Sequence, residues 1–422
     1  MTTVASTRTG AEPRALPLRL NFAWSLLGNV VGAGAQWMLI VILARVGDAA
    51  MVGTYALALS LASPVFLLAN LHLRTLQATD LAGEFTFRTY FGLRLLTSAA
   101  ASLLLAAVGV FLNGSISGGV LMAIAAAKAF EAASEVCYGK LQREERMDRI
   151  GKSMSVRSAG SALAMLAALQ FGWGLAAGAW MGAFIACGVF VYDGHGAWPA
   201  DVSLSDVWPL SPELTRLARF AAPMGVALLL VSLHSNVPRY LLATYRTERE
   251  VGLISALGYL SIAGNMLVMA FGQAAGPALA LSFLERNWYR FRRQAGQLLV
   301  LAAGLGILGI LCAAAFGESL LGAVYGAEFA AERRSFVWLM AAGAASYLGA
   351  ACGYLLSSAR CFRPQIAVLA AGLAVTAVFG WYLIPRRGVS GAALAQAAGY
   401  SAQLLIGAGI LGVSLVRQFG RT

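Results

Sequence analysis

The chain has few charged residues for its length. Asp, Glu, Lys and Arg make up only 12% of its 422 residues, whereas hydrophobic residues make up 59%. A soluble protein has about twice that charged share. The low charge therefore excludes an ordinary soluble domain, and the 47 glycines suit helices that pack closely inside a lipid bilayer. The composition predicts a protein that crosses a membrane several times.

Residues and motifs that carry enzyme chemistry are also scarce. The chain contains only three histidines, which argues against a metal site. The nucleotide-binding sequence GxxxxGK[ST] is absent, and exterior loops of at most roughly 15–20 residues leave little room for a catalytic domain. The cysteines lack metal-ligand spacing and are expected to be free thiols; they are Cys137, Cys187, Cys312, Cys352 and Cys361. We therefore expect a protein that is not an enzyme and has no metal or organic cofactor.

Apolar segments long enough to cross a bilayer recur along the whole chain. A helix needs about 20 mostly apolar residues to cross the hydrocarbon layer. The sequence predicts twelve such spans, near residues 21–44, 50–71, 91–112, 117–139, 155–172, 174–192, 218–243, 251–279, 296–317, 334–357, 365–384 and 391–414. The predicted fold class is an all-α polytopic membrane protein.

Basic residues are distributed unevenly among the connections between these spans. Most of the 31 Lys and Arg fall on one side if the N-terminus lies in the cytoplasm. The second-to-third connection is assigned Arg74, Arg88 and Arg94, and the fourth-to-fifth, residues 140–157, is assigned six basic residues. The positive-inside rule then predicts that both termini are cytoplasmic. The net charge of +12 therefore reflects topology and attraction to anionic lipids rather than nucleic acid binding.

Short segments recur at long, similar offsets. MVGTYALALSL at 51–61 is followed 199 positions later by EVGLISALGYL at 250–260, and each opens a span. The two spans are six apart in order, so the repeats run in the same direction. The sequence thus predicts two six-helix bundles, residues 1–192 and 218–422, joined by a polar cytoplasmic linker at 193–217. Parallel repeats around a central cavity are typical of alternating-access transporters.

Three ionisable residues interrupt the apolar fourth span. Lys128, Glu131 and Glu135 fall within roughly 60° of one another on a helix. A charge near the bilayer centre costs about 2.5–3.5 kcal/mol. Lys128 and Glu131 are spaced to neutralise each other, and water or Lys140 could serve Glu135. An ion pair that braces the bundle is one interpretation; a stripe that faces a water-filled cavity is the other, and three charges favour it.

The seventh span carries a second polar face. Ser232, Asn236 and Arg239 recur at i, i+4 and i+7, beside Pro238, which removes a backbone donor. A guanidinium group at this place suits phosphate oxygens. The alternative is an arginine that extends toward exterior lipid headgroups. Arg45, at the end of the first span, is a further candidate, with a role as a topological anchor as its alternative.

Four segments resemble, in order, those of a known family. They are WSLLGNVVGAGAQWMLIVILARVGDAAMVGTYALALSLASPV (24–65), EAASEVCYGKLQREERM (131–147), SNVPRYLLATYRTEREVGLISALGYL (235–260) and YGAEF (325–329). They look like segments of bacterial polysaccharide exporters and O-antigen type oligosaccharide-lipid flippases, which belong to the multidrug/oligosaccharidyl-lipid/polysaccharide exporter superfamily. The resemblance implies two six-helix bundles around a cavity that opens alternately to each side of the bacterial cytoplasmic (inner) membrane.

The resemblance also implies a cargo and its binding residues. The cargo would be an undecaprenyl-pyrophosphate-linked oligosaccharide, flipped from the cytoplasmic to the periplasmic leaflet for surface polysaccharide biosynthesis. Predicted substrate-binding residues are Arg239, Lys128, Arg45 and Asn236. Glu131 and Glu135 would tune the charge, and one of them would carry a coupling proton if the coupling ion is H+ rather than Na+. Membrane lipids and polysaccharide assembly proteins are the expected partners, with no nucleic acid among them.

Two other functions remain open. An ion-coupled multidrug exporter of the same superfamily would need an acidic, aromatic cavity for cationic cargo; Lys128 and Arg239 disfavour it, whereas Glu131 and Glu135 favour it. A membrane glycan polymerase or ligase is disfavoured by the short exterior loops.

Overall fold

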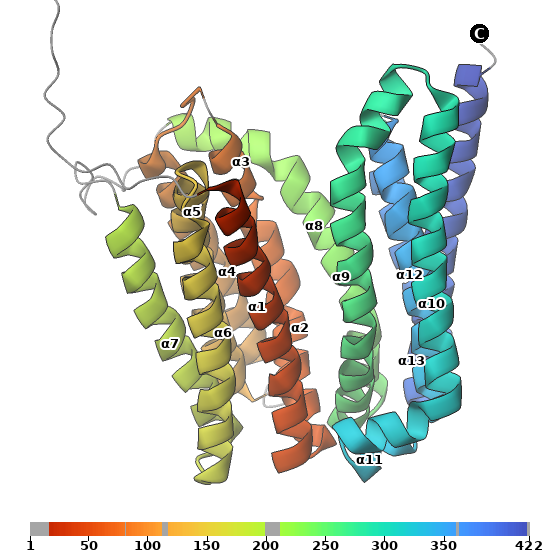
Figure 1. Cartoon of the computed structure of the whole chain (residues 1–422). Helices are drawn as coiled ribbons and strands as arrows, with labels where there is room; N and C mark the ends of the chain where they lie inside the picture. Colours follow the sequence, from red (N-terminus) through yellow and green to blue (C-terminus); the bar gives the residue numbers. More distant parts are fainter. Residues whose placement is uncertain (1–16, 81, 112–116, 199–211, 360–362, 420–422) are drawn as a thin grey trace, which may run out of the picture.

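The computed structural model describes residues 17–80, 82–111, 117–198, 212–359 and 363–419. Within these ranges the elements of secondary structure are all helices, as Figure 1 shows. The first half contains α1 (Leu18–Val46), α2 (Ala49–Asn70), the short α3 (Leu73–Thr79), α4 (Phe87–Phe111), α5 (Gly118–Arg143), α6 (Met147–Gln170) and α7 (Gly174–Ala197). The second half contains α8 (Pro212–Tyr245), α9 (Glu248–Leu284), α10 (Trp288–Val324), the short α11 (Ala327–Ala330), α12 (Arg333–Ser358) and α13 (Arg363–Phe419).

Helix α13 consists of two helices. A straight helix of its 57 residues would be about 85 Å long, more than twice the thickness of a bilayer core. The chain turns at Gly388, whose φ of 53° and ψ of −128° are non-helical, and glycine adopts positive φ without a Cβ clash. Dividing α13 there gives twelve long helices among the described residues, which confirms the predicted fold class.

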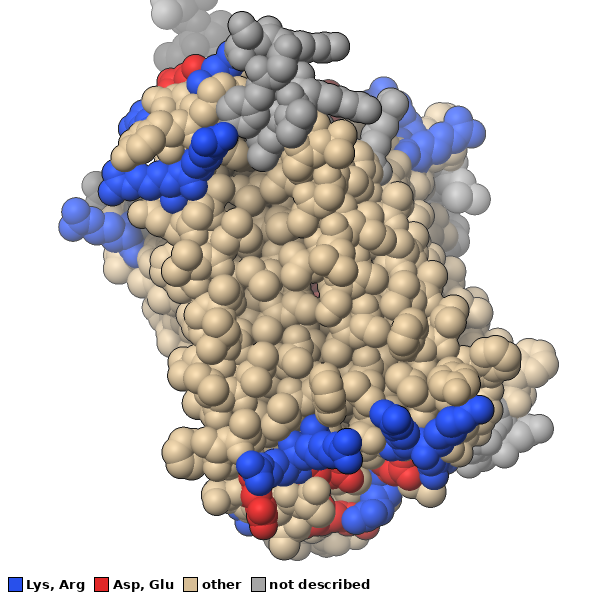
Figure 2. All heavy atoms as spheres, turned by 90° about the vertical axis from the view of Figure 1, so that its right-hand side faces the viewer, with Lys and Arg blue, Asp and Glu red and all other residues tan. Residues whose placement is uncertain are grey.

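The surface of the protein fits a lipid bilayer. Nine of the described helices are long and apolar enough to cross a membrane, with α13 counted once. Figure 2 shows Lys, Arg, Asp and Glu gathered at the two ends of one face, with an uncharged band between them. Large apolar side chains such as Leu103, Phe184 and Val300 are about 70% exposed. The chain is therefore a multi-pass membrane protein.

The two halves pack as separate groups of helices that meet along α2. Helix α2 packs against α8 and α9 of the second half. Helix α8 connects the halves: Leu214, Leu217 and Ala221 pack near its start against the α4 residue Phe91, and its later turns pack against α13. In Figure 1 the beginning of α1 and the C-terminus both lie at the end of the molecule where α3 is found, opposite α11. These two ends are called the α3 end and the α11 end below.

The contact between α2 and α9 is reciprocal. A Cβ atom at Gly53 would overlap the Glu248 carbonyl, and one at Gly252 would overlap the Ala49 carbonyl. Both pairs, 53 with 252 and 49 with 248, are separated by the offset of 199 positions found in the sequence. Exchange of equivalent contacts is what two-fold symmetry produces. The two helices therefore cross at the pseudo-symmetry axis, which confirms the predicted repeat.

Equivalent residues also begin these two helices. Asp48 caps α2, its Oδ1 accepting a hydrogen bond of 2.7 Å from the backbone N–H of Met51. Thr247, 199 positions later, caps α9 by accepting from the N–H of Glu250 at 3.4 Å. A side-chain oxygen at this position satisfies a free N–H of the first helical turn. The local sequence thus fixes where both helices start, and this places the two glycines at the crossing.

Some helices begin or end outside the predicted spans. Helix α6 starts at Met147, so most of residues 140–157, predicted as a connection, is helical. Helix α7 continues to Ala197, which includes the first five residues of the predicted linker, and most of the rest of that linker, residues 199–211, lies outside the described residues. Charged residues near a helix end lower the local hydropathy, so the predicted spans stop short of these helix ends.

Candidate functional site

Three adjoining cavities lie between the two halves and within the neighbouring part of the first half. One of about 300 Å³ surrounds Arg239, one of about 170 Å³ lies within the first half, and one of about 560 Å³ extends toward α3. Gln36 lines the first and second, Ser63 the first and third, and Lys128 and Glu131 the second and third. The three are therefore parts of one polar region, called the central cavity here.

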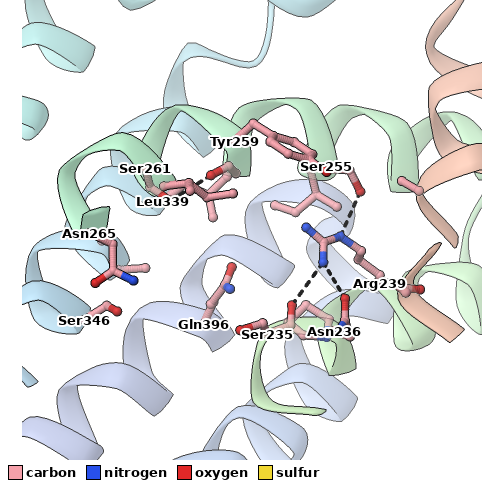
Figure 3. Close-up of a pocket in the computed structure, with 18 of the residues that line it drawn as sticks. Ser235, Asn236, Arg239, Ser255, Tyr259, Ser261, Asn265, Leu339, Ser346 and Gln396 are labelled. Atoms are coloured by element: carbon pink, nitrogen blue, oxygen red, sulfur yellow. Dashed lines mark hydrogen bonds between the residues drawn. The ribbon is translucent and has the colours of Figure 1, made fainter. Parts of the chain in front are cut away.

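Arg239 faces the central cavity from α8. Its Nε donates to the Ser255 hydroxyl at 2.9 Å, and its Nη1 donates to Asn236 Oδ1 at 2.6 Å and to the Ser235 carbonyl at 3.4 Å (Figure 3). Within the described part of the chain, Nη2 has no hydrogen-bond partner and no carboxylate pairs with the guanidinium group. The positive charge of Arg239 is therefore held in place by neutral oxygens and has no counter-ion.

Asn236 holds Arg239 in position. Its Nδ2 donates to the backbone carbonyl of Ser232, one turn earlier, at 2.8 Å, and its side-chain oxygen is the acceptor for Arg239. The side chain is buried, although the residue lines the cavity. The polar face predicted from the spacing 232, 236, 239 exists, and its first two members orient the third.

Lys128 and Glu131 form the ion pair that their spacing predicts. Lys128 Nζ lies 2.8 Å from Glu131 Oε2. The other Glu131 oxygen, Oε1, accepts from Arg157 Nη2 of α6 at 3.2 Å. Glu131 thus has two cationic partners, and all three residues line the central cavity. Both interpretations of this stripe therefore apply: the ion pair joins side chains of the helix bundle, and it also faces the open space of the cavity.

Glu135 has a partner that helical spacing does not predict. Its Oε1 lies 3.5 Å from Arg74 Nη1, whereas Lys140, considered as its partner, pairs instead with Glu144 at 3.6 Å. Arg74 also stacks over the Tyr138 ring at 5.2 Å. Glu135 is therefore neutralised by an arginine of the short helix α3.

Two further arginines of the cavity wall had been assigned to connections. Arg157 lies in the third turn of α6, and its side chain is only 13% exposed. Arg94 lies in α4, is 1% exposed, and donates from Nη1 to Asn70 Oδ1. Their assignment to connections was wrong, because the positive-inside count treats every basic residue near a span end as part of a loop. In a sequence, an acidic residue three or four positions away can indicate that a cation lies inside the bundle, as Glu131 does for Lys128. Neither Arg94 nor Arg157 has such a neighbour on its own helix.

The described residues that line the central cavity carry more positive than negative charge. Five cationic side chains and two carboxylates face it. They are Arg74, Arg94, Lys128, Arg157 and Arg239, against Glu131 and Glu135. Such a cavity suits an anionic cargo, because the excess positive charge needs a negative partner in a medium of low dielectric.

Arg45 lies outside this cavity, at the α11 end. Its guanidinium group donates to the backbone carbonyls of Gly322, Ala323 and Val324 at the end of α10. The carbonyls at a helix C-terminus carry partial negative charge and lack helical partners, so a cation there is stabilising. Arg45 therefore joins the first half to the second, far from Arg239 and Lys128 along the helices.

The sequence YGAEF completes the junction at the α11 end. Tyr325 accepts a hydrogen bond from Trp37 Nε1 at 3.0 Å and donates to the Ala256 carbonyl at 2.9 Å. Glu328 accepts from the backbone N–H of Ala49 at 3.3 Å. Because Trp37 and Ala49 belong to the first half, this motif closes the α11 end of the central cavity.

We expect Arg45→Ala to loosen the α11 end without weakening cargo binding. The Thr54 hydroxyl donates to Glu248 Oε2 at 2.7 Å across the junction, so cysteines at these two positions should react with a short thiol cross-linker. In a chain without its native cysteines, Arg45→Ala should lower the cross-linked fraction severalfold. Unchanged cross-linking together with weaker binding of a pyrophosphate-bearing lipid would instead assign Arg45 to the cargo.

Comparisons with known proteins agree with this architecture. No family model matches the chain. The capsular polysaccharide biosynthesis protein CapF of Staphylococcus aureus is 22% identical over 388 residues, which cover 89% of this chain and 94% of that protein. The lipid II flippase MurJ, in an inward closed conformation, superposes with a TM-score of 0.75 at 9% identity, covering 93% of this chain and 87% of that one. An inward-facing multidrug resistance MATE family transporter of the MOP superfamily gives a TM-score of 0.72 at 12% identity, covering 92% and 95%. The chain therefore has the fold of the flippase MurJ and of MATE family transporters of the MOP superfamily.

This shared fold agrees with the resemblance seen in the sequence. The facing walls of the central cavity differ in charge. The first half supplies four cations and both carboxylates, and the second half supplies Arg239 with hydroxyl and amide groups.

Proposed function

We propose that this protein flips an undecaprenyl-pyrophosphate-linked oligosaccharide from the cytoplasmic to the periplasmic leaflet of a bacterial inner membrane. The observation that carries the proposal is the excess of positive charge around the central cavity, above all at Arg239, which has no carboxylate partner among the described residues. The similarity to a capsular polysaccharide biosynthesis protein supports a glycan cargo. The α3 end would face the cytoplasm, where the positive-inside rule places it.

Arg239 and Lys128 are proposed to bind the pyrophosphate from opposite halves. A pyrophosphate inside a protein of low dielectric must be compensated, because an unpaired buried charge costs several kcal/mol. The planar guanidinium group of Arg239 can contact two phosphate oxygens at once, and Nη2 is free to do so. Since the two cations lie on different halves, relative movement of the halves would separate them and release the cargo.

Lys128 can move away from Glu131 without leaving that carboxylate unpaired. Arg157 already holds the second oxygen of that carboxylate at 3.2 Å, so Glu131 keeps a cationic partner when Lys128 turns to a phosphate. Glu131 and Glu135 are proposed to tune the charge of the cavity in this way. Because each carboxylate is paired in the empty cavity, neither leaves an uncompensated charge between two transport cycles.

Export of cationic drugs is the second candidate. The MATE fold fits it equally well, and the tyrosines Tyr259, Tyr347 and Tyr400 around Arg239 could stack on aromatic or cationic molecules. The balance of charge opposes it, because cationic cargo would meet five positive side chains. A polymerase or ligase has less support, because the fold is that of transporters.

Deletion of the gene separates these functions. For a flippase, surface polysaccharide should be lost and lipid-linked precursor should accumulate on the cytoplasmic side of the membrane. Both effects should be reversed by the wild-type gene and not by one encoding Arg239→Ala at equal abundance. Normal surface polysaccharide with increased sensitivity to cationic dyes would reject the flippase in favour of the drug exporter.

A further inference from the structure

A buried carboxylate lies behind the central cavity, within the first half. Asp193 of α7 is 1% exposed, and its Oδ2 accepts a hydrogen bond from the Ser153 hydroxyl of α6 at 2.8 Å. The Tyr138 hydroxyl of α5 lies 2.6 Å from the same serine oxygen. The three residues therefore form a hydrogen-bonded chain across three helices, each member at most 2% exposed. This hydrogen-bonded chain has no role in the proposed binding of the pyrophosphate.

One side of Asp193 lacks a partner. Its Oδ1 and the Ser134 hydroxyl are both buried without a hydrogen bond of normal geometry, although they lie close to each other. The Ser134 hydroxyl can donate to a carboxylate or accept from a carboxylic acid, so the site can hold Asp193 with or without its proton. Asp193 is 1% exposed and has no ion-pair partner among the described residues, so the neutral acid avoids the cost of a buried charge. The geometry therefore favours a proton on Asp193 in this conformation.

Arg157 stands between this carboxyl group and the cavity. It lies one helical turn after Ser153 on α6, so both project from the same face. Its Nη2 is paired with Glu131, while its Nη1 is buried without a partner. In the described structure no Arg157 nitrogen lies within ion-pair distance of Asp193, although Ser153, one turn earlier on α6, is hydrogen-bonded to that carboxyl group. A cation with one free, buried donor thus has a second carboxylate within reach.

We propose that Asp193 binds and releases the coupling proton, and that its protonation state determines whether Arg157 pairs with Glu131 or with Asp193. With the proton bound, Arg157 stays on Glu131 and leaves Lys128 available to the cavity. When Asp193 releases the proton to water, the new carboxylate attracts Arg157 through its free Nη1. Glu131 then depends on Lys128, and Lys128 is withdrawn from the cavity. The proton site stands on the geometry alone, whereas its effect on cargo rests on the proposed function.

Few other titratable or charged groups face Asp193. From α5 the titratable groups are Cys137 and Tyr138, both fully buried. From α6 there are Arg157 and, two turns nearer the start of that helix, Arg149, which lies against Gly196. Helix α4 meets α7 through aromatic rings such as Phe91 on Phe190, and these do not titrate. Among the described residues, Arg157 is therefore the permanent charge positioned to respond both to Asp193 and to Glu131.

Infrared difference spectroscopy of the whole protein in lipid vesicles tests the proton site without any cargo. Raising the pH should remove a carbonyl band of a protonated carboxyl group in the wild type, and Asp193→Asn should lack that band at every pH. Ser153→Ala keeps the carboxyl group but removes its hydrogen bond, so the band should remain and shift in frequency. Glu135→Gln is the matched control and should leave the band unchanged.

The outcomes are distinct. A wild-type band that persists in Asp193→Asn, or the absence of any titrating band in the wild type, would overturn the proposal. If the band behaves as expected while deletion of the gene leaves surface polysaccharide intact, the proton site stands and the glycan cargo is wrong. For the switch itself, Arg157→Gln should remove the pH dependence of transport while the Asp193 band is retained; unchanged pH dependence in this variant would refute the role of Arg157.

Discussion

Replacing Arg239 by alanine should abolish the proposed export of a glycan while the protein stays in the membrane at normal abundance. The Arg239 side chain is hydrogen-bonded to Ser255 and Asn236 and has no carboxylate partner among the described residues. Its removal therefore leaves no carboxylate of the empty cavity unpaired. The loss falls on the cargo, whose pyrophosphate then enters the cavity with one cation fewer. Breaking a buried ion pair costs about 3–5 kcal/mol, which corresponds to roughly a 100-fold or greater reduction in transport. Surface polysaccharide and the abundance of the protein are the two measurements.

Matched variants separate charge from geometry. Arg239→Lys keeps the charge but loses the two-oxygen contact, so it should retain part of the activity. Lys128→Ala should also abolish export, because the opposing cation is then missing. Arg290→Ala, which removes an exposed arginine near the start of α10 and away from the cavity, should transport normally. Normal export by both cavity variants at normal abundance would show that Arg239 and Lys128 are structural residues.

The sequence predicts the frame of this protein well. Span length and hydropathy identify twelve helices, because crossing a bilayer demands about 20 apolar residues each time. The pair Lys128–Glu131 and the face that carries Arg239 follow from helical spacing, since residues three or four positions apart lie on one side of a helix. These properties depend only on the local chain. The structure contains each of them.

Contacts between helices could not be predicted in the same way. Arg157 and Asp193 belong to segments whose polarity suggested a connection and a linker. Asp193 is nevertheless buried, and the Arg157 side chain is only 13% exposed, because neighbouring helices supply their partners. The sequence places Arg45 at the end of a span. Its contact with the end of α10 depends on the fold and could not be predicted from the local sequence. A residue's local sequence gives its helix and face, whereas its partner depends on how helices far apart in the chain are packed.

The largest effect away from the cavity is expected at the crossing of α2 and α9. A Cβ atom at Gly53 would overlap the Glu248 carbonyl, and backbone of a helix cannot yield as a flexible side chain does. Gly53→Ala should therefore force the two helices apart and disfavour closure of the α11 end. Overpacking costs about 1–3 kcal/mol, which corresponds to a roughly 5- to 100-fold shift between the closed and open arrangements. Cross-linking of cysteines placed at Thr54 and Glu248 should fall accordingly, and export should fail because the cavity no longer closes on that side.

The reciprocal contact makes this prediction stringent. Gly252→Ala meets the Ala49 carbonyl in the same way, so it should act as strongly as Gly53→Ala. Gly188 of α7 has no atom near its Cβ position, and alanine there should be neutral or add up to about 1 kcal/mol of helix stability. Loss of cross-linking in all three variants would point to a general effect of alanine in these helices. Unchanged cross-linking in both Gly53→Ala and Gly252→Ala would mean that the halves do not meet at this crossing in the membrane, and closure of the α11 end would then have to rest on Arg45 and Glu328.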